Sequence, residues 1–91
     1  MTMNWHFANN GDKPKHLAEY LSISGDERYV VPTYYNECKD VMVSYDDCQE
    51  WLIGEHYDEI GVLYDDYVKA WVDINDVLAD YMASKEMRDD V

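Results

Sequence analysis

The last third of the chain carries the most regular pattern of apolar positions. Large apolar side chains alternate in steps of four and three, at Ile60, Tyr64, Tyr67, Trp71, Ile74, Leu78 and Tyr81. This spacing places them along one side of an α-helix, and it predicts a helix over residues 55–87 in which these seven residues form an apolar seam for self-association. At 1.5 Å per residue that helix would be about 50 Å long, more than a small domain covers. We therefore expect either a break at Asp73, which can cap a new helix start, or packing against a second copy.

The first half of the chain predicts one helix and a small hairpin. Pro14 follows an aspartate and a lysine, a pattern typical of a helix start, and it predicts a helix over residues 13–22. Residues 28–31 are mostly aromatic or β-branched and predict a short edge strand, which Pro32 interrupts. Residues 41–43 are the candidate partner strand.

The segment that follows each of these strands is less regular. Residues 34–36 fit a turn or the start of a helical turn, and Ser44 with an acid three residues later resembles a capping box. The latter predicts a short helix over residues 45–53, which Gly54 ends. The expected fold is therefore mainly α, an α+β single domain over residues 1–91. Its long acidic C-terminal helix or helix pair packs on the short N-terminal helix, beside a two-stranded hairpin.

Charge is distributed very unevenly along this pattern. The net charge is −13, and residues 46–91 hold fourteen acidic and three basic side chains, against six and four in residues 1–45. An acidic surface repels nucleic acid and anionic lipid over roughly a Debye length, and it attracts basic surfaces by the same physics. The charge excludes direct nucleic-acid binding and favours a basic DNA- or RNA-binding protein as partner. The alternative is that it serves only solubility.

The carboxylates of the predicted long helix recur in register. Seven fall on or beside one line of the helix, the acidic stripe: Asp58, Glu59, Asp65, Asp66, Asp73, Asp76 and Asp80. Like charges three or four residues apart destabilise a helix by a few tenths of a kcal/mol, and Lys69 is the only base within residues 55–84. Because stability alone would favour more lysines, we interpret the acidic stripe as the partner-binding surface.

No motif of catalysis or metal binding accompanies this charge. The histidines are scattered, Cys38 and Cys48 lack zinc-site spacing, and the acidic run that starts at Asp73 lacks the glycine and the third ligand of a calcium loop. We expect no enzyme, metal or cofactor, and we interpret both cysteines as reduced, buried, small hydrophobes. The chain has no run of about twenty apolar residues and no signal-peptide pattern, so we expect a cytoplasmic protein.

Small size, a charge of −13, the regular carboxylates Glu59, Asp66, Asp73 and Asp80, and many aromatic residues together resemble a known class of protein. The chain is similar to the small acidic DNA-mimic inhibitors that phages encode, the antirestriction and anti-CRISPR proteins. The resemblance is one of class and implies a protein that occupies the nucleic-acid groove of a host nuclease or CRISPR complex in the host cytoplasm. From the apolar seam we also expect a homodimer. Two alternatives stay open: an immunity- or antitoxin-type inhibitor of a basic nuclease, and a dimerisation or adaptor module.

Overall fold

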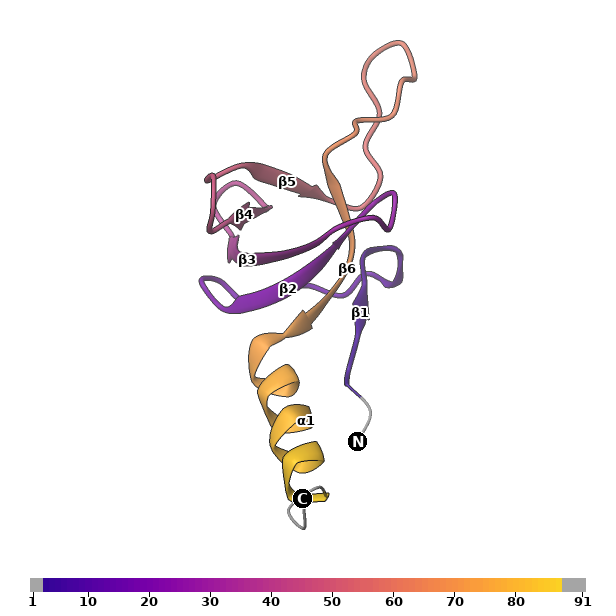
Figure 1. Ribbon diagram of the computed structural model, residues 1–91. Coiled ribbons are helices and arrows are strands. Elements are labelled where there is room, and N and C mark those ends of the chain that lie inside the picture. Colours follow the sequence, from indigo (N-terminus) through magenta and orange to yellow (C-terminus); the bar gives the residue numbers. More distant parts are fainter. Residues whose placement is uncertain (1–2, 88–91) are drawn as a thin grey trace.

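Strands dominate the computed structural model, which describes residues 3–87 (Figure 1). In chain order the elements are β1 (His6–Phe7), the 3-10 turn η1 (Ala8–Asn10), β2 (Glu19–Ser24), β3 (Val30–Asn36), β4 (Val41–Ser44), β5 (Glu50–Ile53), β6 (Tyr67–Asp73) and α1 (Ile74–Met87). The fold is mainly β, and the expected mainly helical fold is wrong.

Strands β2 to β6 form a closed barrel. Neighbours from β2 to β5 pair antiparallel in chain order, and β6 pairs antiparallel with β2 on one edge. On its other edge β6 closes the barrel by parallel pairing with β5, where Leu52 lies opposite Tyr67. The same edge then receives β1 as an extra strand, with His6 opposite Trp71. Strand β6 therefore pairs with three other strands, β1, β2 and β5.

The barrel interior combines one very large side chain with small hydroxyl residues. Trp71 is buried at its centre with Tyr20, Tyr35, Met42 and Val68. Ser22 lies opposite Trp71 across the β2–β6 pair and shares a 2.9 Å hydrogen bond with Thr33 on β3. A small serine beside the indole ring lets a narrow barrel accommodate it, and the hydrogen bond satisfies both buried hydroxyls.

The structure of the first half of the chain contradicts several predictions. Residues 13–22 contain a turn and then β2 instead of a helix, and residues 45–53 contain a turn and then β5. Residues 34–36 continue β3, which is no edge strand because it pairs with both β2 and β4. The predicted strand at residues 41–43 is present as β4, but it pairs with residues 33–36, which include the predicted turn, and not with residues 28–31, so the predicted hairpin is wrong. In β2 the inward-facing Ser22 and Ser24 explain the error, because they hide the apolar alternation that marks a half-buried strand.

The predicted long helix over residues 55–87 is also wrong. Residues 54–66 form a connection without long strands, β6 follows, and only α1 is helical. Asp73 does cap a helix start, since its Oδ1 accepts a 2.7 Å hydrogen bond from the Asn75 N–H in the first turn of α1, but a strand and not a helix precedes it, so no helix breaks there. The apolar seam is split among three elements, and its members Tyr67 and Trp71 are buried in the barrel.

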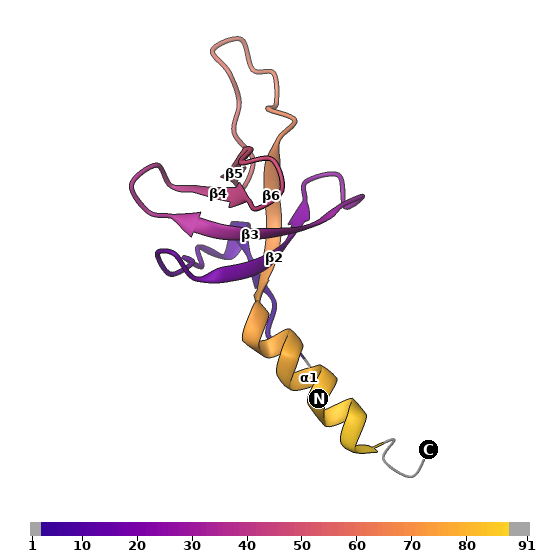
Figure 2. The ribbon, with the colours of Figure 1, turned by 60° about the vertical axis from the view of Figure 1, so that its left-hand side comes forward.

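Two segments project from opposite ends of the barrel. Residues 54–66 extend beyond β5 and β6 at one end, and α1 leaves the end of β6 at the other (Figures 1 and 2). They give the molecule principal extents of 58 × 25 × 23 Å. Both Cys38 and Cys48 are free and exposed, which corrects their expected burial. Among the described residues, no helix has the length and apolar character needed to cross a membrane.

Candidate partner-binding site

The connection between β5 and β6 is unusually long for so small a barrel. It contains thirteen residues, 54–66, which we call the acidic extension. Connections of this length without their own regular structure are uncommon in compact domains and are usually functional or disordered. This one is ordered by backbone pairing: the Tyr64 N–H donates to the His56 carbonyl over 2.8 Å, and the Asp58 N–H to the Val62 carbonyl over 2.9 Å. The acidic extension is thus an irregular hairpin.

Asp58 organises the tip of this hairpin. Its Oδ1 accepts hydrogen bonds from the N–H groups of Ile60 and Val62, over 3.0 and 2.8 Å. Its carbonyl accepts a third, from the N–H of Gly61, whose φ of 87° lies in the region that glycine tolerates best. Asp58 was predicted to bind the partner, and the structure places its carboxylate inside the tip, where it holds the backbone.

Charge and apolar surface are mixed on the acidic extension. It carries five carboxylates and neither Lys nor Arg. Ile60 at the tip is 85% exposed, and Tyr57, Val62 and Tyr64 are each about half exposed or more. Apolar side chains in such positions destabilise the isolated protein, because they gain nothing from burial until a partner covers them. The combination is typical of an interface, where an apolar centre is surrounded by a polar rim.

The seven acids of the acidic stripe lie in two separate groups. Glu59, Asp65 and Asp66 are exposed on the acidic extension, where Asp58 is only partly exposed. Asp73 ends β6 opposite Tyr20 of β2, and Asp76 and Asp80 lie in α1, which leaves the other end of the barrel; all three are only partly exposed. No continuous stripe forms because no continuous helix does, so a single partner surface would meet only one group.

The remaining members of the apolar seam are divided in the same way. Ile60 and Tyr64 lie on the acidic extension, and Ile74, Leu78 and Tyr81 lie on α1. The seam therefore does not exist as one surface.

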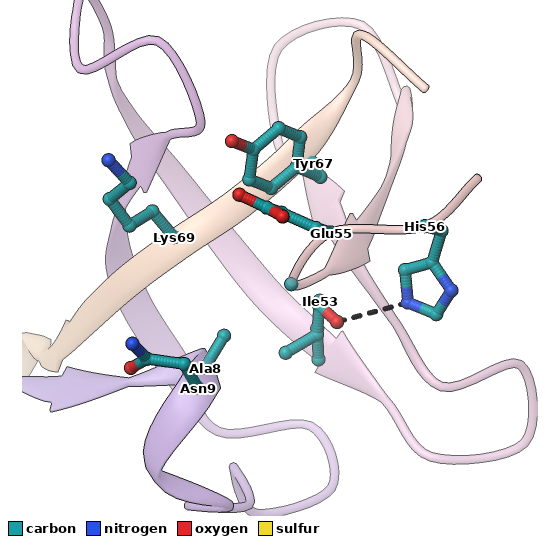
Figure 3. A pocket seen from close by; sticks show the side chains of 8 residues that line it. Ala8, Asn9, Ile53, Glu55, His56, Tyr67 and Lys69 are labelled. Atoms are coloured by element: carbon teal, nitrogen blue, oxygen red, sulfur yellow. Dashed lines mark hydrogen bonds between the residues drawn. The ribbon is translucent and has the colours of Figure 1, made fainter. Parts of the chain in front are cut away.

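A cleft of about 560 Å³ lies at the base of the acidic extension (Figure 3). Its lining comes from η1, from the end of β5 with the first residues of the acidic extension, and from β6: Ala8, Asn9, Ile53, Gly54, Glu55, His56, Tyr67 and Lys69. Sequence reasoning missed this grouping. No local spacing signals it, because the barrel brings η1 beside residues more than forty positions later in the chain.

The polar groups of the cleft are engaged with one another or with nearby residues. Lys69 donates a 2.6 Å hydrogen bond to Glu27, and this carboxylate raises the pKa of Lys69 above its ordinary value. A nucleophilic lysine needs the opposite shift. The Tyr57 hydroxyl donates to Glu55 over 3.0 Å, and a His56 ring nitrogen lies 3.1 Å from the Ile53 carbonyl, the contact drawn in Figure 3. This arrangement provides no base beside a nucleophile.

Metal ligands are not grouped within residues 3–87, where no three His, Cys, Asp or Glu side chains come together closely enough to hold an ion. The cleft and the acidic extension are thus the candidate sites of the described chain, and only the acidic extension combines exposure, order and strong charge. No protein-family model, curated protein or solved structure matches the chain.

Proposed function

We propose that this protein is a non-enzymatic inhibitor that acts in the manner of a DNA mimic. It binds the nucleic-acid-binding surface of a basic protein, a host defence nuclease or a CRISPR complex, through the acidic extension. The observation that carries the proposal is the ordered tip, which presents carboxylates without any Lys or Arg among the thirteen positions of the segment.

The acids of the barrel behave differently from those of the acidic extension. In the barrel, Lys13, Lys39 and Lys69 lie within 4.0 Å of Asp40, Glu50 and Glu27, so several carboxylates there are neutralised locally. Among residues 3–87 no such ion pair involves a carboxylate of the acidic extension. Its negative field is therefore directed to solvent, where it can attract a basic groove.

Several weak contacts must combine for this surface to bind well. One exposed ion pair contributes only about 0–1 kcal/mol, whereas clustered charges steer association and add their contributions. An ordered tip helps because the backbone does not have to be immobilised on binding. The charge is concentrated at one end of the molecule, so we propose local mimicry of a few phosphates, not mimicry of a long duplex.

The test compares two variants that lose the same charge from different places. Glu59→Gln/Asp65→Asn/Asp66→Asn neutralises the acidic extension and leaves Asp58 in place. Its control, Glu37→Gln/Asp46→Asn/Asp47→Asn, neutralises three exposed acids of the barrel connections. Each protein is immobilised and exposed to host-cell lysate with and without excess duplex DNA.

A target of the proposed kind is captured by the wild type and by the control variant. The variant with the neutralised acidic extension does not capture it, and excess duplex DNA prevents its capture by the wild type. Capture of the same proteins by both triple variants would show that the charge acts only generically. Capture that duplex DNA leaves unchanged would contradict mimicry.

A further inference from the structure

Strand β3 runs past the end of its neighbour β4 (Figure 2). It has seven residues, and only the last four, residues 33–36, pair with β4. The first three, residues 30–32, pair with β2 on the opposite side. The beginning of β3 therefore has an edge that no strand covers on the β4 side.

The free backbone groups of this edge belong to Val30. Successive residues of a strand direct their N–H and C=O groups to alternate sides, and the Pro32 carbonyl accepts a 3.2 Å hydrogen bond from the Tyr45 N–H on the β4 side. Val30, two residues before Pro32, thus faces the β4 side as well. The chain has turned away there, since the Cys48 N–H donates to the Ser44 carbonyl over 3.0 Å. Within residues 3–87 no strand lies beside that side of Val30.

A groove of about 300 Å³ follows this edge into the mouth of the barrel. Val31 lies opposite the buried Ser22 and so faces the barrel interior, and Trp51 packs against the core. Tyr29 and Val30 are 59 and 60% exposed, so much of the groove is apolar surface open to solvent. The full lining is Tyr29, Val30, Val31, Pro32, Ser44, Asp46, Asp47 and Trp51.

The indole of Trp51 supplies a second unused hydrogen-bonding group. Its Nε1 is buried and has no acceptor among the described residues. A buried donor without an acceptor is rare and destabilises the protein. A carbonyl placed in the groove would satisfy it, and a free N–H and C=O pair on Val30 is what an added strand requires. Both features point to an extended polypeptide.

The charge of the groove selects the kind of polypeptide. Asp46 and Asp47 are exposed, and among residues 3–87 neither carboxylate lies within 4.0 Å of a Lys or Arg side chain. Asp47 Oδ1 also accepts a 3.0 Å hydrogen bond from the Gln49 N–H, which fixes its position. These carboxylates favour a basic occupant. A second copy of this chain, with a net charge of −13, would be repelled.

We propose that this groove binds an extended segment of a partner protein in which apolar and basic side chains alternate. The segment adds as a strand beside Val30, and one of its carbonyls accepts from the Trp51 indole. Its apolar side chains cover Val31, and an Arg or Lys meets Asp46 and Asp47. The main-chain bonds supply affinity, and the side-chain contacts supply specificity. The groove shares no residue with the acidic extension and does not depend on its function.

The experiment titrates a capped five-residue peptide, three valines separated by two arginines, into the ¹⁵N-labelled full chain and follows NMR signals. We expect saturable shifts at the Val30 amide and at the Trp51 indole N–H, which should move downfield as it gains an acceptor. Trp51→Phe identifies the indole signal. A peptide with glutamates in place of the arginines tests charge, and one with N-methylated backbone amides tests strand addition.

Both altered peptides should bind at least tenfold more weakly than the basic peptide. Asp46→Asn/Asp47→Asn should weaken binding of the basic peptide about tenfold, within the range of two exposed ion pairs. Its matched control, Glu59→Gln/Asp65→Asn, removes the same charge from the acidic extension and should leave the shift at Val30 unchanged. Asp46 and Asp47 are also neutralised in the control variant of the lysate test, so the groove and the acidic extension can fail independently.

Three results would overturn the proposal. The first is a wild type whose shifts are confined to residues 55–66, because that would be attraction to charge alone. The second is equal binding of the arginine and glutamate peptides. The third is equal binding of the N-methylated peptide, which cannot donate main-chain hydrogen bonds. The comparison of peptides on the wild type needs no variant to fold.

Discussion

The acidic extension and α1 both project from the barrel and both carry acids and exposed apolar side chains, yet they are organised in opposite ways. In the acidic extension, charged and apolar residues are interleaved, and side-chain bonds from Asp58 hold the backbone. In α1, backbone hydrogen bonds between successive turns of the helix hold the backbone, and acidic and apolar residues lie on opposite sides.

This difference decides what each segment can bind. A mixed acidic and apolar surface suits a basic partner, and that binding weakens as salt rises. Contacts made by a separated apolar face are not screened by salt. The salt dependence of binding therefore distinguishes the two surfaces.

The largest effect is expected from replacing residues 56–64 by a short Gly-Ser turn. The ends of the removed segment are already joined by the bond from the Tyr64 N–H to the His56 carbonyl, so the barrel should close without strain. Partner binding should be abolished while the circular dichroism signal of α1 is unchanged. Halving the connection should raise the free energy of unfolding by about 0.6 kcal/mol in urea titration. A variant that still binds the partner would show that the acidic extension is not the partner-binding surface.

The next effect is expected at Gly25, which links the barrel to the acidic extension. A Cβ there would overlap the ring of Tyr67, the first residue after the acidic extension, whose carbonyl accepts a 2.9 Å bond from the Gly25 N–H. Gly25→Ala should lower the free energy of unfolding by about 1–3 kcal/mol, because the ring must move. Hydrogen exchange should rise more in residues 55–66 than in α1, and the reverse pattern would contradict this coupling.

A smaller effect is expected at the start of α1. Asp73→Ala removes the cap that bonds the Asn75 N–H and should cost about 1 kcal/mol of helix stability. Helical circular dichroism should fall, while partner binding stays the same. Asp80→Ala is the control, because it removes a charge of the same helix without removing a cap.

The smallest effect on the whole protein is expected at Asp58. Asp58→Ala removes two hydrogen bonds from the tip, which lies outside the barrel core, so the midpoint of unfolding should change little. Amide exchange at Ile60 and Val62 should nevertheless accelerate severalfold, and partner binding should weaken. Glu59→Ala removes a neighbouring charge without these bonds and should leave that exchange unchanged.

The parts of the fold that sequence predicted are those fixed by local chemistry. Asp73 is a capping residue by its own side chain, and the helix does begin after it. The strand from Val41 is rich in β-branched residues and is present, although it pairs with residues 33–36 and not with the predicted 28–31. The rest depends on contacts far apart in the chain: β6 is covered on both sides, so it is apolar at most positions and its aromatic residues also match helical spacing.

The candidate site was predicted in composition but not in shape. The acids of residues 55–66 are conspicuous in the sequence, but their alignment in one stripe required a continuous helix. In the structure a turn at Asp58 and Gly61, followed by a barrel strand, takes the place of that helix. The buried serines that open space for Trp71 gave no apolar signal, so closure of the barrel, which separates Asp66 from Asp76, was not predictable from spacing.

The most direct test of the central claim uses a captured target protein and a fluorescently labelled duplex DNA. Titrating this protein into the target–DNA complex should lower the fluorescence anisotropy to that of free DNA. The control Glu37→Gln/Asp46→Asn/Asp47→Asn should do the same, and Glu59→Gln/Asp65→Asn/Asp66→Asn should displace the DNA only at a concentration about tenfold higher or more. Anisotropy that stays constant or rises would show that DNA and this protein occupy the target together, and would contradict the claim that the acidic extension takes the place of nucleic acid.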